Sequence, residues 1–298
     1  MGYDHRRRYG FLLSLKSSVH SIRTVGLTLL ALGLVGQICS TSLEVTENTA
    51  LKKTVLQSIE KYYFKSINIE ELKKKTLSEI FESLDNDSAL VKSLPKELDY
   101  VRGFKKKNGT LEERLLVGGV GYIRFNSFKD STFQEFLSSH KKLVEEGAKN
   151  WIFDLRGNEG GNFKSALKLV ECFVPYGELV GAIQYKERVE ITLSENKMPW
   201  NDRVVLLVDS KTASSAEFLV KSLKKNLNSQ IVGLPTAGKR TIQQMIPLHG
   251  MWLSLTVGEW SVYENKMEEK MGPIDPDYIL KDTEEQMKKA ISLLQSSL

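Results

Sequence analysis

The chain has 298 residues, of which 41% are hydrophobic and 27% are charged, the balance of a globular protein that can bury a core. Its formal net charge is +5, but residues 1–42 carry five basic side chains against one acidic side chain, so the remainder is close to neutral. The positive charge therefore belongs to the leader, and it gives no reason to expect a nucleic-acid partner.

The first 42 residues have the layout of a signal peptide. A basic stretch through Arg23 precedes an apolar run, Val25–Val35, which is short for a membrane span and has the length of a signal-peptide core. We expect export, with cleavage near Ser40 or Ser42, in preference to an uncleaved N-terminal anchor. The protein is then expected in the periplasm or cell envelope or outside the cell, and a retained leader would associate it with a membrane.

Residues 43–99 are predicted to be helical. Leu51, Val55 and Ile59 follow helical spacing, and Asn68 is a suitable cap for a second helix. The run Asp85–Ser88 and then Pro95 interrupt the pattern, and residues 101–111 suggest a linker or a hairpin.

From residue 112 onward, apolar strands alternate with helices, which predicts an α/β fold with a mainly parallel sheet covered on both faces. The expected strands are Val120–Phe125, Trp151–Leu155 and Val204–Val208, followed by β-type segments from Ile231 to Tyr263; the expected helices are Ser131–Glu146, Lys164–Phe173, Ala216–Leu227 and Thr283–Leu294.

Histidine and metal chemistry have little support in the sequence. Outside the leader the histidines are His140, in a polar part of a predicted helix, and His249, in a predicted turn, and neither stands where a strand delivers residues to a site. There is no H-E-x-x-H motif, and the two cysteines, Cys39 and Cys172, form no metal cluster or disulfide framework. We expect no metal and no cofactor, and we expect Cys172 to be a buried thiol.

A serine at the start of a helix is the first candidate for chemistry. Ser214 follows the strand Val204–Val208 and a short turn, where free backbone N–H groups and the helix dipole can stabilise an oxyanion. The same residues, Ser214–Glu217, also read as an S-x-x-E capping box, and most such serines only cap helices.

A glycine-rich loop is the second candidate. Asp154–Gly161 follows an apolar strand and precedes a helix, so its glycines could present backbone N–H groups to a ligand. Together with the Ser215 amide it could form an oxyanion hole, or it could be a tight strand–helix turn. It is neither G-x-G-x-x-G nor a Walker loop.

A lysine followed by an extended segment is the third candidate. In Gly238–Gln243, extended backbone would place Lys239, Thr241 and Gln243 on one face. A lysine serves as a base only where its surroundings favour the neutral amine, and a neighbouring amide such as Gln243 could orient it. A solvated lysine before a strand is the plain alternative.

Taken together, these three elements resemble peptidase family S41, the tail-specific or carboxyl-terminal-processing proteases. Ile152–Gly161 matches the family pattern I-x-D-L-R-G-N-x-G-G, and residues 212–217 read T-A-S-S-A-E. Lys239 follows Ser214 by 25 positions and Gln243 follows four later, as in the family. The similarity extends over roughly residues 50–280, including Gly119–Ile123, the hairpin Leu248–Thr256 and Gly272–Asp277.

The resemblance implies a ClpP/crotonase-like spiral ββα core with a helical N-terminal segment. It also implies a serine endopeptidase acting on unfolded or extended polypeptides, with Ser214 as nucleophile, Lys239 as general base and Gln243 as its orienting residue. The implied oxyanion hole uses the backbone of Gly160, Gly161 and Ser215. The alternatives are a non-catalytic S41-like protein that binds peptides or apolar ligands, and a crotonase-like acyl-CoA enzyme.

One departure from the family is expected. These proteases usually carry a PDZ domain before the catalytic core, but only residues 99–119 separate Leu98 from Val120. The expected organisation is therefore a leader at 1–42, a helical segment at 43–99 and an S41-type catalytic domain at 100–298 without a PDZ domain.

Overall fold

The structure, a computed structural model, describes residues 49–92, 110–263 and 272–295. The predicted leader, Cys39, Pro95 and most of the predicted linker at 101–111 lie outside these residues, so the predictions for them stay untested.

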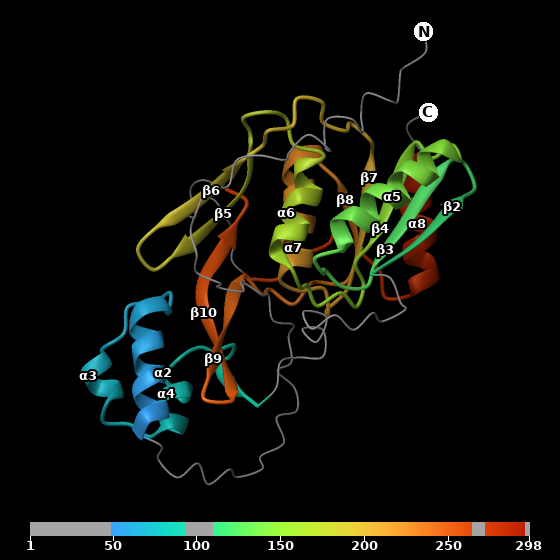
Figure 1. Cartoon of the computed structure of the whole chain (residues 1–298). Coiled ribbons are helices and arrows are strands. Elements are labelled where there is room, and N and C mark those ends of the chain that lie inside the picture. Colours follow the sequence, from blue (N-terminus) through green and yellow to red (C-terminus); the bar gives the residue numbers. More distant parts are fainter. Residues whose placement is uncertain (1–48, 93–109, 264–271, 296–298) are drawn as a thin grey trace.

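A six-stranded sheet forms the centre of the molecule (Figure 1). In spatial order its strands are β11 (Tyr278–Ile279), β8 (Gln230–Gly233), β7 (Val204–Val208), β4 (Asn150–Asp154), β3 (Val120–Phe125) and β2 (Leu111–Leu116). All neighbours are parallel except β2, which forms an antiparallel hairpin with β3. The mainly parallel sheet predicted from the sequence is confirmed.

Helices cover both faces of this sheet, as expected. The first face carries α5 (Thr132–Glu145), α6 (Phe163–Glu171) and α7 (Ser215–Leu227), and the second carries α8 (Thr283–Gln295). All residues of β7 are apolar because the strand is buried on both faces. Leu206 joins the cluster under α5–α7, whereas Val205 and Leu207 pack against Ala290 of α8. Successive side chains of a strand point to opposite faces of the sheet, so a strand that is covered on both faces needs apolar residues at every position.

A second, antiparallel sheet stands beside the first. It contains β1 (Ala89–Val91), β10 (Met251–Ser261), β5 (Leu179–Tyr185) and β6 (Val189–Leu193) in that order, with β9 (Thr241–Leu248) also paired to β10. Figure 1 shows the β9–β10 hairpin reaching from the sheet region to the N-terminal helices.

The N-terminal helices are α2 (Thr49–Tyr62), α3 (Ile69–Leu72) and α4 (Leu77–Glu82). Asn68 caps α3 as predicted, since its side chain accepts the N–H of Glu70 at 3.1 Å. Their apolar residues form one cluster with Leu248, Leu253 and Leu255 of the β9–β10 hairpin. The helical prediction for 43–99 is wrong at Ala89–Val91, because pairing with β10 satisfies the backbone there as a strand.

Within the described residues, no helix combines the length and the apolar character needed to cross a bilayer.

Candidate active site

Ser214 lies in the turn between β7 and α7, directly before the first residue of the helix. Its backbone has φ 55° and ψ −120°, a conformation that non-glycine residues rarely adopt. Such strain persists only where the surrounding structure imposes it, and it concentrates at functional sites. A serine on a sharp, strained strand-to-helix turn is one way in which hydrolases present a nucleophile.

Ser214 and Glu217 have the arrangement of a capping box, but the Ser214 side chain makes no cap hydrogen bond. Its Oγ atom is buried and makes no hydrogen bond to any described residue. The backbone N–H of Ser214 instead donates to Glu217 Oε2 at 3.0 Å, which is the other half of the predicted capping box. The neighbouring Ser215 differs, because its Oγ donates to the carbonyl of Gly161 at 3.0 Å. Among the described residues, therefore, no hydrogen bond gives the hydroxyl of Ser214 a structural role.

The glycine-rich loop packs directly against this turn. Asn158 organises it: its carbonyl accepts the N–H of Ala213 at 3.0 Å, and its side-chain amide donates to the carbonyl of Phe125 at 2.8 Å. Gly160 has φ 101°, and a Cβ on it would lie 2.8 Å from the Ala213 oxygen and 2.9 Å from Ser214 Cβ. Glycine is required at this position because the loop backbone touches the serine turn.

The loop amides differ in their availability as oxyanion donors. The N–H of Gly160 already donates to Asn158 Oδ1 at 2.8 Å. This bond leaves the N–H groups of Gly161 and Ser215 as the stronger candidates among the three residues that the sequence suggested. The Cβ position of Gly160 lies 3.1 Å from the Ser215 nitrogen, so loop and helix start are in contact there.

The D-L-R part of the loop motif has a structural role. Asp154 is fully buried, and its two carboxylate oxygens accept bonds from the Arg156 guanidinium and from the hydroxyl of Tyr122. Arg156 in turn donates to Gln286 of α8 at 2.8 Å. This network anchors the loop to the far face of the sheet.

Glu217 ties the serine turn to the lysine segment. Its buried carboxylate accepts the N–H groups of Ser214 at 3.0 Å, Gly238 at 2.7 Å and Lys239 at 2.8 Å, and the hydroxyl of Thr236. Burial raises the pKa of Glu217, although these four bonds favour its charged form. Because Oε2 accepts from both Ser214 and Lys239, the backbones of these residues lie next to each other.

The ends of the three proposed catalytic side chains are not bonded to one another. The Lys239 ammonium donates to Asp87 Oδ1 at 2.8 Å. Gln243 is fully buried; its Nε2 donates to Thr256 Oγ1 at 3.4 Å, and its Oε1 has no partner among the described residues. The fold brings Ser214, Lys239 and Gln243 into one region, but it turns the lysine toward Asp87.

Asp87, Asn158 and Glu217 also belong to this region, and none of them is among the site residues predicted from the sequence. In the sequence, Glu217 reads as part of a capping box and of the T-A-S-S-A-E motif, and Asn158 as part of the glycine-rich motif. The turn that contains Asp87 reads in the sequence only as an interruption of the helical pattern. Nothing local in the sequence marks Asp87, because its contact with Lys239 spans 152 positions.

His140 and His249, the two histidines outside the leader, are not bonded to Ser214. His140 is buried and stacks on Trp151 and Trp200, with ring centroids 4.3 and 3.8 Å away. His249 lies in the turn between β9 and β10. In the part of the chain that the structure describes, no three His, Cys, Asp or Glu side chains are grouped as a metal site would need. Cys172 is a buried thiol, as predicted, and burial raises its pKa.

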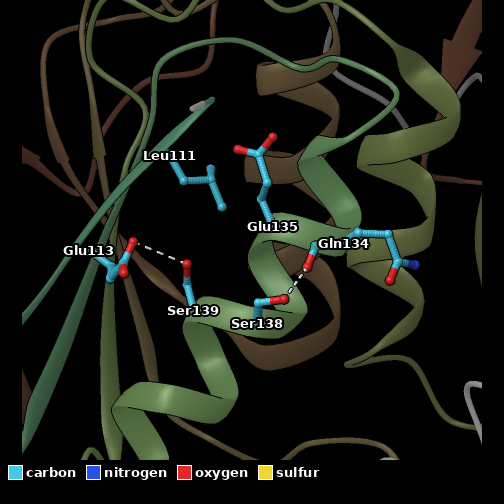
Figure 2. A pocket seen from close by; sticks show the side chains of 6 residues that line it. All are labelled: Leu111, Glu113, Gln134, Glu135, Ser138 and Ser139. Atoms are coloured by element: carbon cyan, nitrogen blue, oxygen red, sulfur yellow. Dashed lines mark hydrogen bonds between the residues drawn. The ribbon is translucent and has the colours of Figure 1, made fainter. Parts of the chain in front are cut away.

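Figure 2 shows an open hollow between β2 and α5, lined by Leu111, Glu113, Gln134, Glu135, Ser138 and Ser139. The hydroxyl of Ser139 donates to Glu113 across it at 3.2 Å. None of the residues proposed for chemistry lines this hollow, so it is separate from the serine turn.

The fold and the site together define an α/β protein with a strained serine turn held against a glycine loop and a lysine segment. Residues 119–280 match the family model of peptidase family S41, and the chain belongs to this family. Its mixed α/β fold is that of S41 protease structures, with the expected ClpP/crotonase-like core.

Individual relatives agree with this assignment. The chain is 30% identical over 165 residues to the carboxy-terminal processing protease CtpA of Bacillus subtilis, a match that covers 55% of this chain and 35% of that protein. Among solved structures, a lipoprotein from Streptococcus agalactiae superposes with a TM-score of 0.62 at 20% identity, over 83% of this chain and 96% of that one. A photosystem II D1 C-terminal processing protease gives 0.50 at 22% identity, over 60% and 50%. The chain thus spans little more than a third of the Bacillus protein's length.

Proposed function

We propose that this protein is a serine endopeptidase that cleaves unfolded or extended polypeptides through an acyl-enzyme, with Ser214 as nucleophile and Lys239 as general base. One observation carries the proposal: the buried Ser214 hydroxyl makes no hydrogen bond to the described residues, and it lies at a strained turn that touches the glycine loop. Membership of a peptidase family supports it.

The proposed mechanism gives each of these groups one chemical role. The neutral amine of Lys239 takes the proton of Ser214 Oγ as that oxygen attacks the peptide carbonyl carbon. Collapse of the tetrahedral intermediate breaks the C–N bond, and the lysine returns the proton to the leaving amine. Water, deprotonated by the same lysine, then attacks the ester carbonyl carbon; the bond from that carbon to Oγ breaks, and the lysine returns the proton to Ser214 Oγ. We assign to Gln243 the role of accepting a bond from the amine and orienting it, because its buried Oε1 has no partner among the described residues.

The oxyanion needs donors that are already in position. We assign this role to the backbone N–H groups of Gly161 and Ser215, with Gly160 shaping the loop, since its own amide is engaged by Asn158. Preorganised donors of this kind contribute strongly because they do not have to reorient during the reaction.

The test is mass spectrometry of the protein after treatment with a fluorophosphonate, which forms an Oγ–phosphorus bond and releases fluoride. Modification of Ser214 and not of Ser215 is expected. Absence of any modified serine in folded protein would remove the nucleophile and favour the non-catalytic binding protein instead.

Substrate choice is proposed to come from the catalytic groove. We propose that no PDZ domain separates the helical segment from the catalytic domain, which would leave no dedicated pocket for a substrate's terminal carboxylate. An extended chain must still reach Ser214, and folded proteins supply one only by local unfolding.

We therefore expect an unfolded reporter to be cleaved at similar rates whether its C-terminal tail is apolar or ends in charged residues. The two rates should agree within about threefold, because the two tails differ only in small contacts with the groove. The two reporters are compared by gel-based cleavage rates under identical conditions. A strong preference for the apolar tail would show that a tail-binding site exists after all.

We also propose that the protein is exported, on the strength of the leader at residues 1–42 and its likeness to a bacterial lipoprotein structure. The mature chain is expected to begin between about Cys39 and Leu43. Mass determination of the N-terminal peptide, from protein purified from its own cells, measures this. An intact Met1 would indicate a membrane anchor.

A further inference from the structure

The turn between α4 and β1 contacts the proposed base directly. Asp87 Oδ1 accepts the Lys239 ammonium at 2.8 Å, and Asp87 Oδ2 accepts the hydroxyl of Thr241 at 2.5 Å. The Lys239 and Asp87 side chains are only 14% and 19% exposed. Both oxygens of the Asp87 carboxylate thus accept hydrogen bonds from Lys239 and Thr241, at the start of β9.

The turn is held rigidly in this position. Asp85 Oδ1 accepts the N–H of Asp87 and the hydroxyl of Thr256, both at 2.8 Å, and the hydroxyl of Ser88 donates to Asp85 Oδ2 at 3.1 Å. Beyond the turn, β1 pairs with β10, and before it α4 belongs to the apolar cluster on the β9–β10 hairpin. The N-terminal helices therefore present Asp87 to Lys239 as part of a packed unit.

This contact leaves two buried acceptors without partners. Ser214 Oγ and Gln243 Oε1 make no hydrogen bond to the described residues, and buried polar atoms are rarely left so. Lys239 could serve Ser214, because the backbone N–H groups of these residues share Glu217 Oε2, and Gln243 follows Lys239 by four positions along the chain. The lysine is bonded to Asp87 instead, and a charge-assisted bond of this kind is stronger than one between neutral groups.

We propose that Asp87 is a positioning residue that holds Lys239 away from Ser214 in the resting protein, so that the N-terminal helices restrain the catalytic machinery. An ammonium bonded to a carboxylate has neither the position nor the lone pair that a base needs. To act, Lys239 must leave Asp87, lose its proton to solvent and approach Ser214 and Gln243. This inference rests on the proposed function.

The test compares the rate at which a fluorophosphonate modifies Ser214 in the wild type and in Asp87→Asn. Loss of the charge frees the lysine, and we expect labelling to become about tenfold faster, the scale of one hydrogen bond to a charged group. Asp87→Glu keeps the charge and is expected to stay within about threefold of the wild type. Glu145→Gln, which removes the acid of the exposed Lys141–Glu145 pair, is the matched control and should change nothing.

Thr241→Val is a second variant that leaves the Asp87 turn unchanged in sequence. It removes one of the bonds that fix the carboxylate, and a smaller rise in labelling, about two- to threefold, is expected.

Thermal unfolding of each variant shows whether it is folded. Labelling of folded Asp87→Asn at the wild-type rate or below would overturn the proposed restraint while leaving the serine mechanism intact. No labelling of Ser214 in any variant, including the wild type, would overturn the proposed function itself.

Discussion

Ser214→Ala is expected to abolish cleavage of an unfolded protein such as casein, lowering the rate on the order of a thousandfold or more. The reason is that the substitution removes the atom that forms the acyl bond, while the glycine loop and the lysine remain. Cleavage is measured by release of acid-soluble peptides, in wild type and variant at equal concentration.

The variant should remain folded. A helix-capping serine would stabilise the protein by about 1 kcal/mol. The Ser214 hydroxyl, however, makes no hydrogen bond to the described residues, and alanine at φ 55° is strained to a similar degree. Thermal unfolding close to that of the wild type is therefore expected.

Ser215→Ala is the control on the neighbouring hydroxyl. It loses the bond from Oγ to the Gly161 carbonyl, and so it should weaken the loop but retain measurable cleavage. If Ser214→Ala cleaved casein at the wild-type rate, the nucleophile would have to be sought elsewhere.

Lys239→Arg is expected to be inactive, with a rate lowered by about 10²–10⁴-fold, the contribution typical of a general base. A guanidinium keeps its proton at any usable pH, so arginine preserves the positive charge but cannot accept the proton of Ser214. It can still bond to Asp87, and the folded structure should persist. Casein cleavage and thermal unfolding are measured together.

A second lysine offers a matched control. Lys224, on α7, donates to both oxygens of Asp277 at 2.8 Å, away from the proposed site. Lys224→Arg should keep its activity, since the ion pair is retained and no proton transfer depends on it. Activity that survived in Lys239→Arg, and was lost on replacing His140 or His249, would point to a histidine base.

Local patterns in the sequence predicted much of the α/β core. The helices α5, α6, α7 and α8 and the strands β3, β4 and β7 were expected within two residues of their observed ends, because their apolar periodicity reflects which faces are buried. The hairpin strands β5 and β6 were not expected. The sequence of β6 does alternate apolar and polar residues, which is a strand pattern, but its apolar residues Val189, Ile191 and Leu193 are exposed in the structure.

For the site, the sequence by itself determined which residue types stand in the motifs around Ser214, Lys239 and Gln243, and their spacing led to the family. Only the tertiary structure decided how these residues meet. The positive φ of Ser214 occurs where its turn is in contact with Gly160, and the partner of Lys239 comes from a turn 152 positions away. Backbone strain and long-range ion pairs depend on how separate elements pack, and a local pattern of residues does not encode that packing.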